Sequence, residues 1–314
     1  MILSVSRRTD IPTYYSEWFL NRIREGYVMV RNPMNYHQVS KIKITPDVVD
    51  GIVFWTKNPA PFLPKLKELV SYHYYFQFTL NSYAADIEPG IPFKGTHIIP
   101  TFQRLSEKIG PGRVIWRYDP ILLSETYTIG YHIKYFERLV RLLHNHTQKC
   151  TISFIDLYRS TRNNVKDLGM TSLNEERKVL LAGALSEIAR SYGLEMDTCA
   201  EDAELEAYGV THARCVDSRL IEKMSGHSLK VEKDKHQRPA CGCMASIDVG
   251  AYNTCRSGCK YCYANHSPQT VNTNSSKHIL TSPLLYGELT NEDRVTERAV
   301  KSCRVCSQQN IFIS

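Results

Sequence analysis

The architecture of this protein can be read from residues 51–79, GIVFWTKNPAPFLPKLKELVSYHYYFQFT. The first part, Gly51 to Trp55, is short and rich in β-branched and aromatic residues, which predicts a buried strand. A polar loop follows, and the amphipathic stretch from Phe62 to Ser71 predicts a helix. A second aromatic run, Tyr74 to Thr79, predicts another strand. A strand, a helix and a strand in this order predict two parallel strands joined by a crossover.

The same unit recurs on both sides of this stretch. Further strands are predicted at Ile2 to Val5, Arg113 to Tyr118, Cys150 to Ile155 and Leu194 to Thr198, and further helices at Tyr14 to Glu25, Ile98 to Ile109, Ile129 to His144 and Ser172 to Tyr192. Six strands alternating with helices predict an α/β fold, either a TIM-like or a partial (β/α)6 barrel. We predict that residues 1–225 form this barrel. Residues 226–314 are loop-rich and cysteine-rich, and we predict that they pack on the barrel rim around a bound cluster.

Composition limits the class of protein. The 314 residues are 42% hydrophobic and 23% charged, which excludes a collagen-like chain and a wholly disordered one. No apolar run approaches the ~18 residues of a membrane span, and Met1 leads into Arg7 and Arg8 rather than into an apolar signal stretch. We therefore expect a cytoplasmic protein with no membrane partner. The formal net charge of +7 supports a nucleic-acid partner only weakly.

The cysteines are concentrated in the second half of the chain. Of the ten, only Cys150 lies in the first 198 residues, and in a cytosolic chain this crowding favours metal ligation over disulfides. Three of them, Cys255, Cys259 and Cys262, have the spacing C-x3-C-x2-C. Three thiolates on one loop can hold three irons of a [4Fe-4S] cluster and leave the fourth iron open to a substrate or cofactor. The alternative is a zinc site with a fourth ligand such as His266.

A second group consists of Cys199, Cys215, Cys241 and Cys243. Four thiolates can ligate a complete second [4Fe-4S] cluster or a structural zinc ion. In the alternative interpretation, Cys199 and Cys215 are small core residues, and Cys241 and Cys243 are unpaired loop thiols. Cys303 and Cys306 have C-x2-C spacing, but a single pair in a terminal segment indicates no function.

The predicted strand ends carry polar side chains that should meet at one rim, because the carboxyl ends of parallel strands in a barrel share one face. Cations suited to a carboxylate or phosphate are Arg7, Arg8, Lys57 and Arg117, and acceptors for ribose hydroxyls or an ammonium group are Asp10, Asp119, Asp156 and Glu201. We expect substrate to be bound by Arg7, Arg8, Asp10 and Lys57. We expect a cofactor to be bound by Asn58, Asn81, Arg117, Asp119 and Asp156. The alternatives are ion pairs that brace the rim, such as Arg117 with Asp119, and loop caps for Asn58 and Asn81.

The cysteine spacing, with Tyr261 directly before the third cysteine, resembles the signature of the radical S-adenosylmethionine enzymes. The partial (β/α)6 barrel of those enzymes agrees with the number of predicted strands. A wider likeness rests on SVSRRTDIP (4–12), FWTKNP (54–59), WRYDPIL (116–122), SFIDLY (153–158) and the segment from Asn253 to Asn265. On these strings nearly the whole chain resembles the family called domain of unknown function 1848 (DUF1848), which names no substrate.

The resemblance implies that Cys255, Cys259 and Cys262 bind the cluster, that S-adenosylmethionine chelates the open iron, and that Tyr261 lies near its adenine. It implies an enzyme that cleaves S-adenosylmethionine and generates a radical on an unknown substrate, with a flavodoxin- or ferredoxin-like electron donor. Radical enzymes usually carry the cluster loop after the first strand, whereas here it follows all six. The contrasting hypothesis is a non-catalytic zinc or iron-sulfur protein that binds a partner or nucleic acid. No catalytic side chain is assigned.

Overall fold

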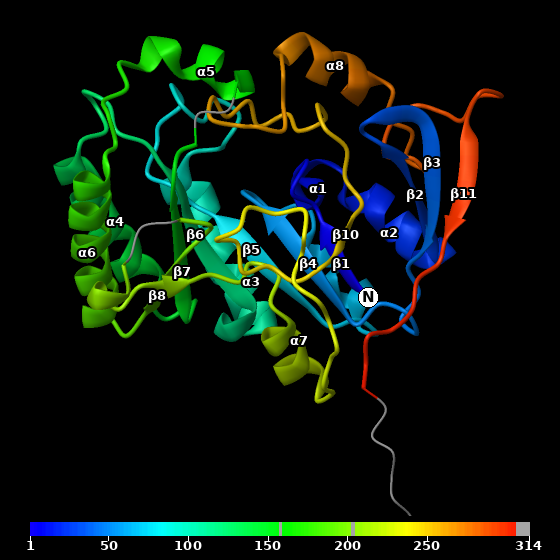
Figure 1. Ribbon diagram of the computed structural model, residues 1–314, viewed down its shortest axis with the longest axis horizontal. Helices are drawn as coiled ribbons and strands as arrows, with labels where there is room; N and C mark the ends of the chain where they lie inside the picture. Colours follow the sequence, from blue (N-terminus) through cyan, green and yellow to red (C-terminus); the bar gives the residue numbers. More distant parts are fainter. Residues whose placement is uncertain (157–158, 202–204, 306–314) are drawn as a thin grey trace, which may run out of the picture.

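The computed structural model describes residues 1–156, 159–201 and 205–305. Its central strands are β1 (Ile2–Val5), β4 (Gly51–Thr56), β5 (Tyr74–Thr79), β6 (Val114–Ile121), β7 (Lys149–Phe154), β8 (Glu195–Thr198), β9 (Thr211–His212) and β10 (Ile247–Asp248). They form one sheet in the order β10-β1-β4-β5-β6-β7-β8-β9, and every neighbouring pair is parallel (Figure 1). The predicted α/β fold with parallel strands is confirmed, and its six longer strands are the six that the sequence predicts.

The six longer strands follow one another across the sheet in chain order. The chain therefore winds in one direction and does not reverse as it does in doubly wound sheets. Within the described ranges no pairing joins the edge strands β9 and β10, and the sheet is open. The sheet therefore does not form the closed, TIM-like barrel that was one of the two expected forms.

The helices differ from the predicted ones mainly near prolines and at helix ends. Their bounds are α1 (Ile11–Tyr14), α2 (Ser16–Glu25), η1 (Leu63–Leu69), η2 (Lys94–Ile98), α3 (Ile99–Ile109), η3 (Pro111–Arg113), α4 (Ile129–Leu143), α5 (Arg159–Val165), η4 (Lys166–Leu168), α6 (Glu175–Ser191), η5 (Glu206–Tyr208), α7 (Ser218–Ser225) and α8 (Pro268–Ser276). The predicted helix from Phe62 is observed as the 3-10 helix η1. The helices α4 and α6 lie side by side along one end of the sheet (Figure 1).

The two faces of the sheet are buried against different parts of the chain, because alternate side chains of a strand point to opposite faces. One face contributes to the main core beneath the helices, with Leu3, Phe54, Phe76 and Trp116. The other face contributes Ile2, Val53, Tyr75 and Ile115, which pack with residues around α7 and with the buried Cys215, Cys241 and Cys243. Residues of α7 and the segments that carry these cysteines therefore pack together on this face of the sheet.

A small second sheet was not predicted from the sequence. It consists of β2 (Tyr27–Asn32), β3 (Asn35–Lys43) and β11 (Arg294–Arg298), with β3 in the middle, antiparallel to β2 and parallel to β11. All five residues of β11 are exposed, and β3 fully buries only Val39 and Ile42. Neither strand therefore has the apolar alternation by which a strand is recognised.

The segment after residue 225 takes part in both sheets. It supplies β10, which pairs with β1, and β11, which pairs with β3. The predicted domain boundary between residues 225 and 226 thus separates two parts of the chain that contribute strands to the same two sheets. In the part of the chain that the structure describes, no helix is long and apolar enough to cross a bilayer.

Candidate functional site

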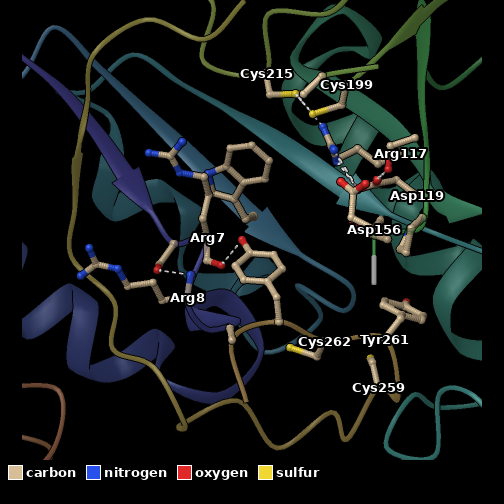
Figure 2. A pocket seen from close by; sticks show the side chains of 18 of the residues that line it. Arg7, Arg8, Arg117, Asp119, Asp156, Cys199, Cys215, Cys259, Tyr261 and Cys262 are labelled. Carbon is tan, nitrogen blue, oxygen red and sulfur yellow. Dashed lines mark hydrogen bonds and ion pairs between the residues drawn. The ribbon is translucent and has the colours of Figure 1, made fainter. Parts of the chain in front are cut away.

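A cavity of about 580 Å³ lies at the carboxyl ends of the parallel strands. Its wall includes residues at the ends of these strands, such as Thr56, Thr79, Phe154 and Asp248. All the cysteines of both predicted groups also line it: Cys199, Cys215, Cys241, Cys243, Cys255, Cys259 and Cys262. In Figure 2 the Cys199 and Cys215 side chains lie at the end of the view opposite to Cys259 and Cys262, with Arg117 and Asp119 on the side between them.

The C-x3-C-x2-C loop is held from two sides. The Tyr15 hydroxyl, at the end of α1, donates a hydrogen bond to the carbonyl of Thr254 at 2.6 Å. On the other side, the loop after β5 binds it through the amide of Gly90, which donates to Ser257 at 2.9 Å, and the carbonyl of Ile87, which accepts from Lys260 at 3.0 Å. These backbone contacts fix the three cysteines at the edge of the cavity.

The three thiols of this loop have the donor chemistry of an iron-sulfur ligand set. Cys259 is buried, Cys255 and Cys262 are half-buried, and burial raises the pKa of the Cys262 thiol to about 11. Within the described ranges no three His, Cys, Asp or Glu side chains are grouped as ligands of one ion. A cubane binds its thiolates through different irons, so its ligands lie further apart than those of a single ion. Three soft donors that line one cavity have the ligand chemistry that such a cluster needs.

Among the described residues, one buried hydroxyl beside the cavity is unusual. The Thr9 hydroxyl is buried, Thr9 lines the cavity, and its oxygen has no hydrogen-bond partner among the described residues. A buried hydroxyl without a partner is uncommon because its desolvation is not compensated. Because this oxygen is also inaccessible from the cavity, it supplies no ligand contact in this structure.

Behind Tyr261 lies a buried carboxylate that the sequence analysis missed. Glu88 accepts contacts from the Lys57 ammonium at 2.8 Å and the Lys94 ammonium at 2.5 Å, and the Tyr261 hydroxyl also donates to it. Burial alone would raise the pKa of Glu88, but the two ammonium groups lower it to about 2. Lys57 also lies 5.3 Å from the centre of the Tyr261 ring. The predicted substrate ligand Lys57 therefore lines the cavity while it positions Tyr261. The only available sequence signal for Glu88 was its place on a loop after a predicted strand.

Arg117 and Asp119 form an ion pair. This is the alternative role that the sequence left open for them, in which they brace the rim and do not bind a ligand. The Arg117 guanidinium lies 2.7 Å from Asp119, and it donates a hydrogen bond to the sulfur of Cys215 at 2.8 Å. The Ser153 hydroxyl donates to the same carboxylate. Although burial opposes ionisation, Arg117 holds the pKa of Asp119 below its usual value. Both residues line the cavity, and both already have strong partners within the chain.

Arg7 and Arg8 are directed toward the C-terminal segment. In Figure 2 both side chains point away from Cys259 and Cys262. The Arg7 guanidinium lies 3.6 Å from Asp234 and 3.9 Å from Asp248, and that of Arg8 lies 5.1 Å from the ring centre of Tyr252. Arg7 and Arg8, predicted to bind substrate, therefore line the cavity and join the loop after β1 to its outer wall.

Asp248 is a second residue that the sequence analysis missed. Its carboxylate accepts hydrogen bonds from the hydroxyls of Ser4 and Ser6 at 2.9 and 2.6 Å, and from the amides of Arg7 and Gly250 at 2.8 and 2.9 Å. It thereby ties the edge strand β10 to β1 and to the loop that follows β1.

The other predicted ligand-binding residues have different roles around the cavity. Asp10 lines it, caps α1 and accepts hydrogen bonds from Thr56 at 2.8 Å and from the amide of Lys57 at 2.7 Å. Asp156 lines it and forms an ion pair with Arg238. Asn58 and Asn81 lie outside the lining. Asn58 caps its own loop through the amide of Ala60, and Asn81 joins the Asp119 backbone to Tyr261.

The second cysteine group comes together from three segments. The sulfurs of Cys199 and Cys215 are 3.4 Å apart, and Cys215, Cys241 and Cys243 lie in one buried cluster against which Cys199 packs. His266, the alternative zinc ligand, is exposed and does not line the cavity. Cys303 also lies outside the cavity lining, and Cys306 lies outside the described residues.

Residues 2–264 match the model of a protein family described as Domain of unknown function (DUF1848). The chain belongs to this family. The DUF1848 match includes every cysteine that lines the cavity. No curated protein matches the chain.

Among solved structures, the chain is similar to a crystal structure from Bacteroides thetaiotaomicron that is provisionally assigned as an alpha-L-fucosidase. The identity is 12%, the match covers 56% of this chain and 71% of that chain, and the TM-score is 0.26. A likeness at this level bears on neither the fold nor the activity of the DUF1848 chain.

Proposed function

We propose that this protein is a radical S-adenosylmethionine-like iron-sulfur enzyme. The observation that carries the proposal is the place of the C-x3-C-x2-C loop, whose three cysteines line a cavity at the carboxyl ends of the parallel strands. Ligands of (β/α) barrels bind at this end of the strands. The six longer strands wind in one direction and leave the sheet open, which supports a partial (β/α)6 barrel.

In this proposal Cys255, Cys259 and Cys262 hold three irons of a [4Fe-4S] cluster, and the open iron takes S-adenosylmethionine. When bound, the cluster would supply one electron to the sulfonium, which breaks a carbon–sulfur bond and leaves a thioether and a carbon radical. Tyr261 lines the cavity next to the third cysteine, and Glu88, Asn81 and Lys57 keep its ring in place. Such a side chain is suited to orient an adenine by packing against it.

The outer wall of the cavity would limit the access of water. It is formed by residues 236–238, Cys241, Cys243, Tyr252 and several residues of the C-x3-C-x2-C loop in the C-terminal segment. Asp248 and the contacts of Arg7 with Asp234 and Asp248 attach this wall to the rim. A reactive radical requires such enclosure, because solvent and outside molecules would otherwise quench it.

The test compares wild type with the triple variant Cys255→Ala/Cys259→Ala/Cys262→Ala after anaerobic reconstitution with iron and sulfide. We expect wild type to cleave S-adenosylmethionine in the presence of dithionite and the triple variant not to, with the fragments identified by mass spectrometry. Cys150→Ala is the matched control, because Cys150 is buried in the main core and does not line the cavity. Equal cleavage in wild type and the triple variant would refute the proposal. Colourless wild type that carries only zinc would favour the non-catalytic metal protein.

A further inference from the structure

We propose that Cys199, Cys215, Cys241 and Cys243 are the ligands of a second metal centre that is held entirely by protein thiolates. Cys199 directly follows β8, Cys215 follows β9, and Cys241 and Cys243 precede β10. The sulfurs of Cys199 and Cys215 are 3.4 Å apart, and Cys215, Cys241 and Cys243 lie in one buried cluster against which Cys199 packs. Four thiols from three segments are thus brought together on one side of the sheet. Four cysteine thiolates are the ligand set of closed zinc sites and of complete iron-sulfur clusters.

The surroundings of these thiols differ from those of an ordinary core cysteine. The Arg117 guanidinium donates to the Cys215 sulfur at 2.8 Å, and the amide of Val216 donates to the Cys243 sulfur at 3.5 Å. Donors directed at sulfur stabilise a thiolate and are typical of the residues that surround ligated cysteines. Cys150 lies in the main core without such a group of thiols, although it is equally buried.

The burial of the four cysteines agrees with a centre inside the molecule. Cys215, Cys241 and Cys243 are buried, and Cys199 is half-buried. All four line the cavity, and Figure 2 shows Cys199 and Cys215 at the end opposite to Cys259 and Cys262. A metal at this place would pin the segments after β8, after β9 and before β10 to one another, and it would stiffen the wall that faces the C-x3-C-x2-C loop.

Two kinds of metal share this ligand chemistry. Neighbouring sulfurs around a tetrahedral zinc ion lie about 3.8 Å apart, since each Zn–S bond is about 2.3 Å long. The 3.4 Å contact of Cys199 with Cys215 is close to this spacing. Among the described residues no three of these side chains are grouped around one point, so the thiols must turn inward around an ion or spread outward around a [4Fe-4S] cluster. The experiment distinguishes a zinc ion from a [4Fe-4S] cluster.

The decisive protein is the triple variant Cys255→Ala/Cys259→Ala/Cys262→Ala, because it retains all four ligands of the second centre and none of the first. After anaerobic purification, iron, sulfide and zinc are measured per chain by mass spectrometry and colorimetry. We expect about one zinc per chain if the centre is a zinc site, or about four irons with sulfide if it is a [4Fe-4S] cluster. The additional change Cys215→Ala/Cys243→Ala should remove this metal, whereas the additional change Cys150→Ala should leave it. A triple variant with neither metal, after reconstitution with iron and sulfide and separately with zinc, would overturn the proposal.

A second measurement does not depend on whether the Cys215→Ala/Cys243→Ala chain folds. The triple variant is alkylated with iodoacetamide before and after treatment with a chelator, and the modified cysteines are identified by mass spectrometry. We expect the chelator to expose Cys199, Cys215, Cys241 and Cys243, with Cys150 unchanged as the internal control. Alkylation that the chelator does not change would contradict the proposal. Because the two ligand sets share no residue, failure of the first cluster leaves these results interpretable.

Discussion

Arg117 of β6 contacts Asp119, Gln77 and Cys215 in the interior of the molecule, and its side chain is 5% exposed. Arg117→Ala leaves the Asp119 carboxylate without its charged partner. We therefore expect the free energy of unfolding, measured in urea, to fall by about 3 to 5 kcal/mol. Arg117→Lys keeps the charge but cannot reproduce the planar contacts, so its loss should be smaller. Unchanged stability together with weakened ligand binding would identify Arg117 as a ligand-binding residue rather than a brace.

His132 of α4 gives the protein a specific sensitivity to acid. The ring is fully buried, with one nitrogen 2.8 Å from the Tyr118 hydroxyl and the other 2.9 Å from the Leu122 carbonyl. Burial lowers the pKa of His132 to about 4, whereas an unfolded histidine titrates near about 6.5. Because the unfolded state takes up the proton first, the stability due to neutral His132 is fully present above about pH 6.5 and is lost as the pH falls toward about 4.

This loss has a maximum slope of about 1.4 kcal/mol per pH unit, the value for one proton. We expect His132→Gln to show a shallower decline of the free energy of unfolding between about pH 6.5 and pH 4 than wild type. Urea unfolding of both proteins at a series of pH values measures the difference. Other titrating groups contribute equally to both proteins, so parallel curves would show that His132 is not the group responsible.

The loop after β5 and the C-x3-C-x2-C loop approach each other so closely that only glycine fits at position 90. A Cβ atom at Gly90 would lie 2.6 Å from the carbonyl oxygen of Ser257 and 2.9 Å from that of Arg256. Because these neighbours are backbone atoms, Gly90→Ala should displace the cysteine loop. We expect faster amide exchange in residues 253–262 and a lower iron content per chain than in wild type.

Gly130 near the start of α4 provides the matched control. The nearest atom to a Cβ there is the Thr128 hydroxyl oxygen at 3.9 Å, and alanine is favoured over glycine in a helix. Gly130→Ala should therefore leave both the exchange of the loop and the iron content unchanged. If Gly90→Ala behaves like Gly130→Ala, the contact between the two loops is not what holds the cysteines in place.

The N-terminal part of the chain and the segment after residue 225 contribute strands to the same sheets. We therefore expect the two parts to unfold together. β10 pairs with β1, β11 pairs with β3, and Cys241 and Cys243 pack against the face of the sheet that carries Val53 and Tyr75. We expect tryptophan fluorescence, which reports on Trp18, Trp55 and Trp116, and alkylation of Cys241 and Cys243 to follow one unfolding transition. Residues 1–225 expressed alone should bind hydrophobic dyes and lack a sharp transition. A sharp, native-like transition of that fragment would instead support two domains with a boundary at residue 225.

Local patterns in the sequence were sufficient for the main elements. The strands β1, β4, β5 and β6 are rich in apolar residues and flanked by polar loops, because both faces of the parallel sheet are buried there. A parallel sheet places the carboxyl ends of its strands together, so side chains as distant as Asp10, Arg117 and Cys199 could be expected at one cavity. The spacing C-x3-C-x2-C is chemically distinctive wherever it occurs, and it does not depend on the rest of the fold.

The partners of individual side chains could not be found in this way. Nothing in the sequence indicates that Glu88 binds both Lys57 and Lys94, that Asp248 joins β10 to the loop after β1, or that Arg117 reaches Cys215. The small sheet with β3 and β11 was missed, and the sheet of parallel strands is open where a closed barrel was one expectation. These features depend on contacts between residues far apart in the chain. Such contacts are selected by shape, burial and charge once the elements have packed, and they leave no periodic trace in the segments that take part.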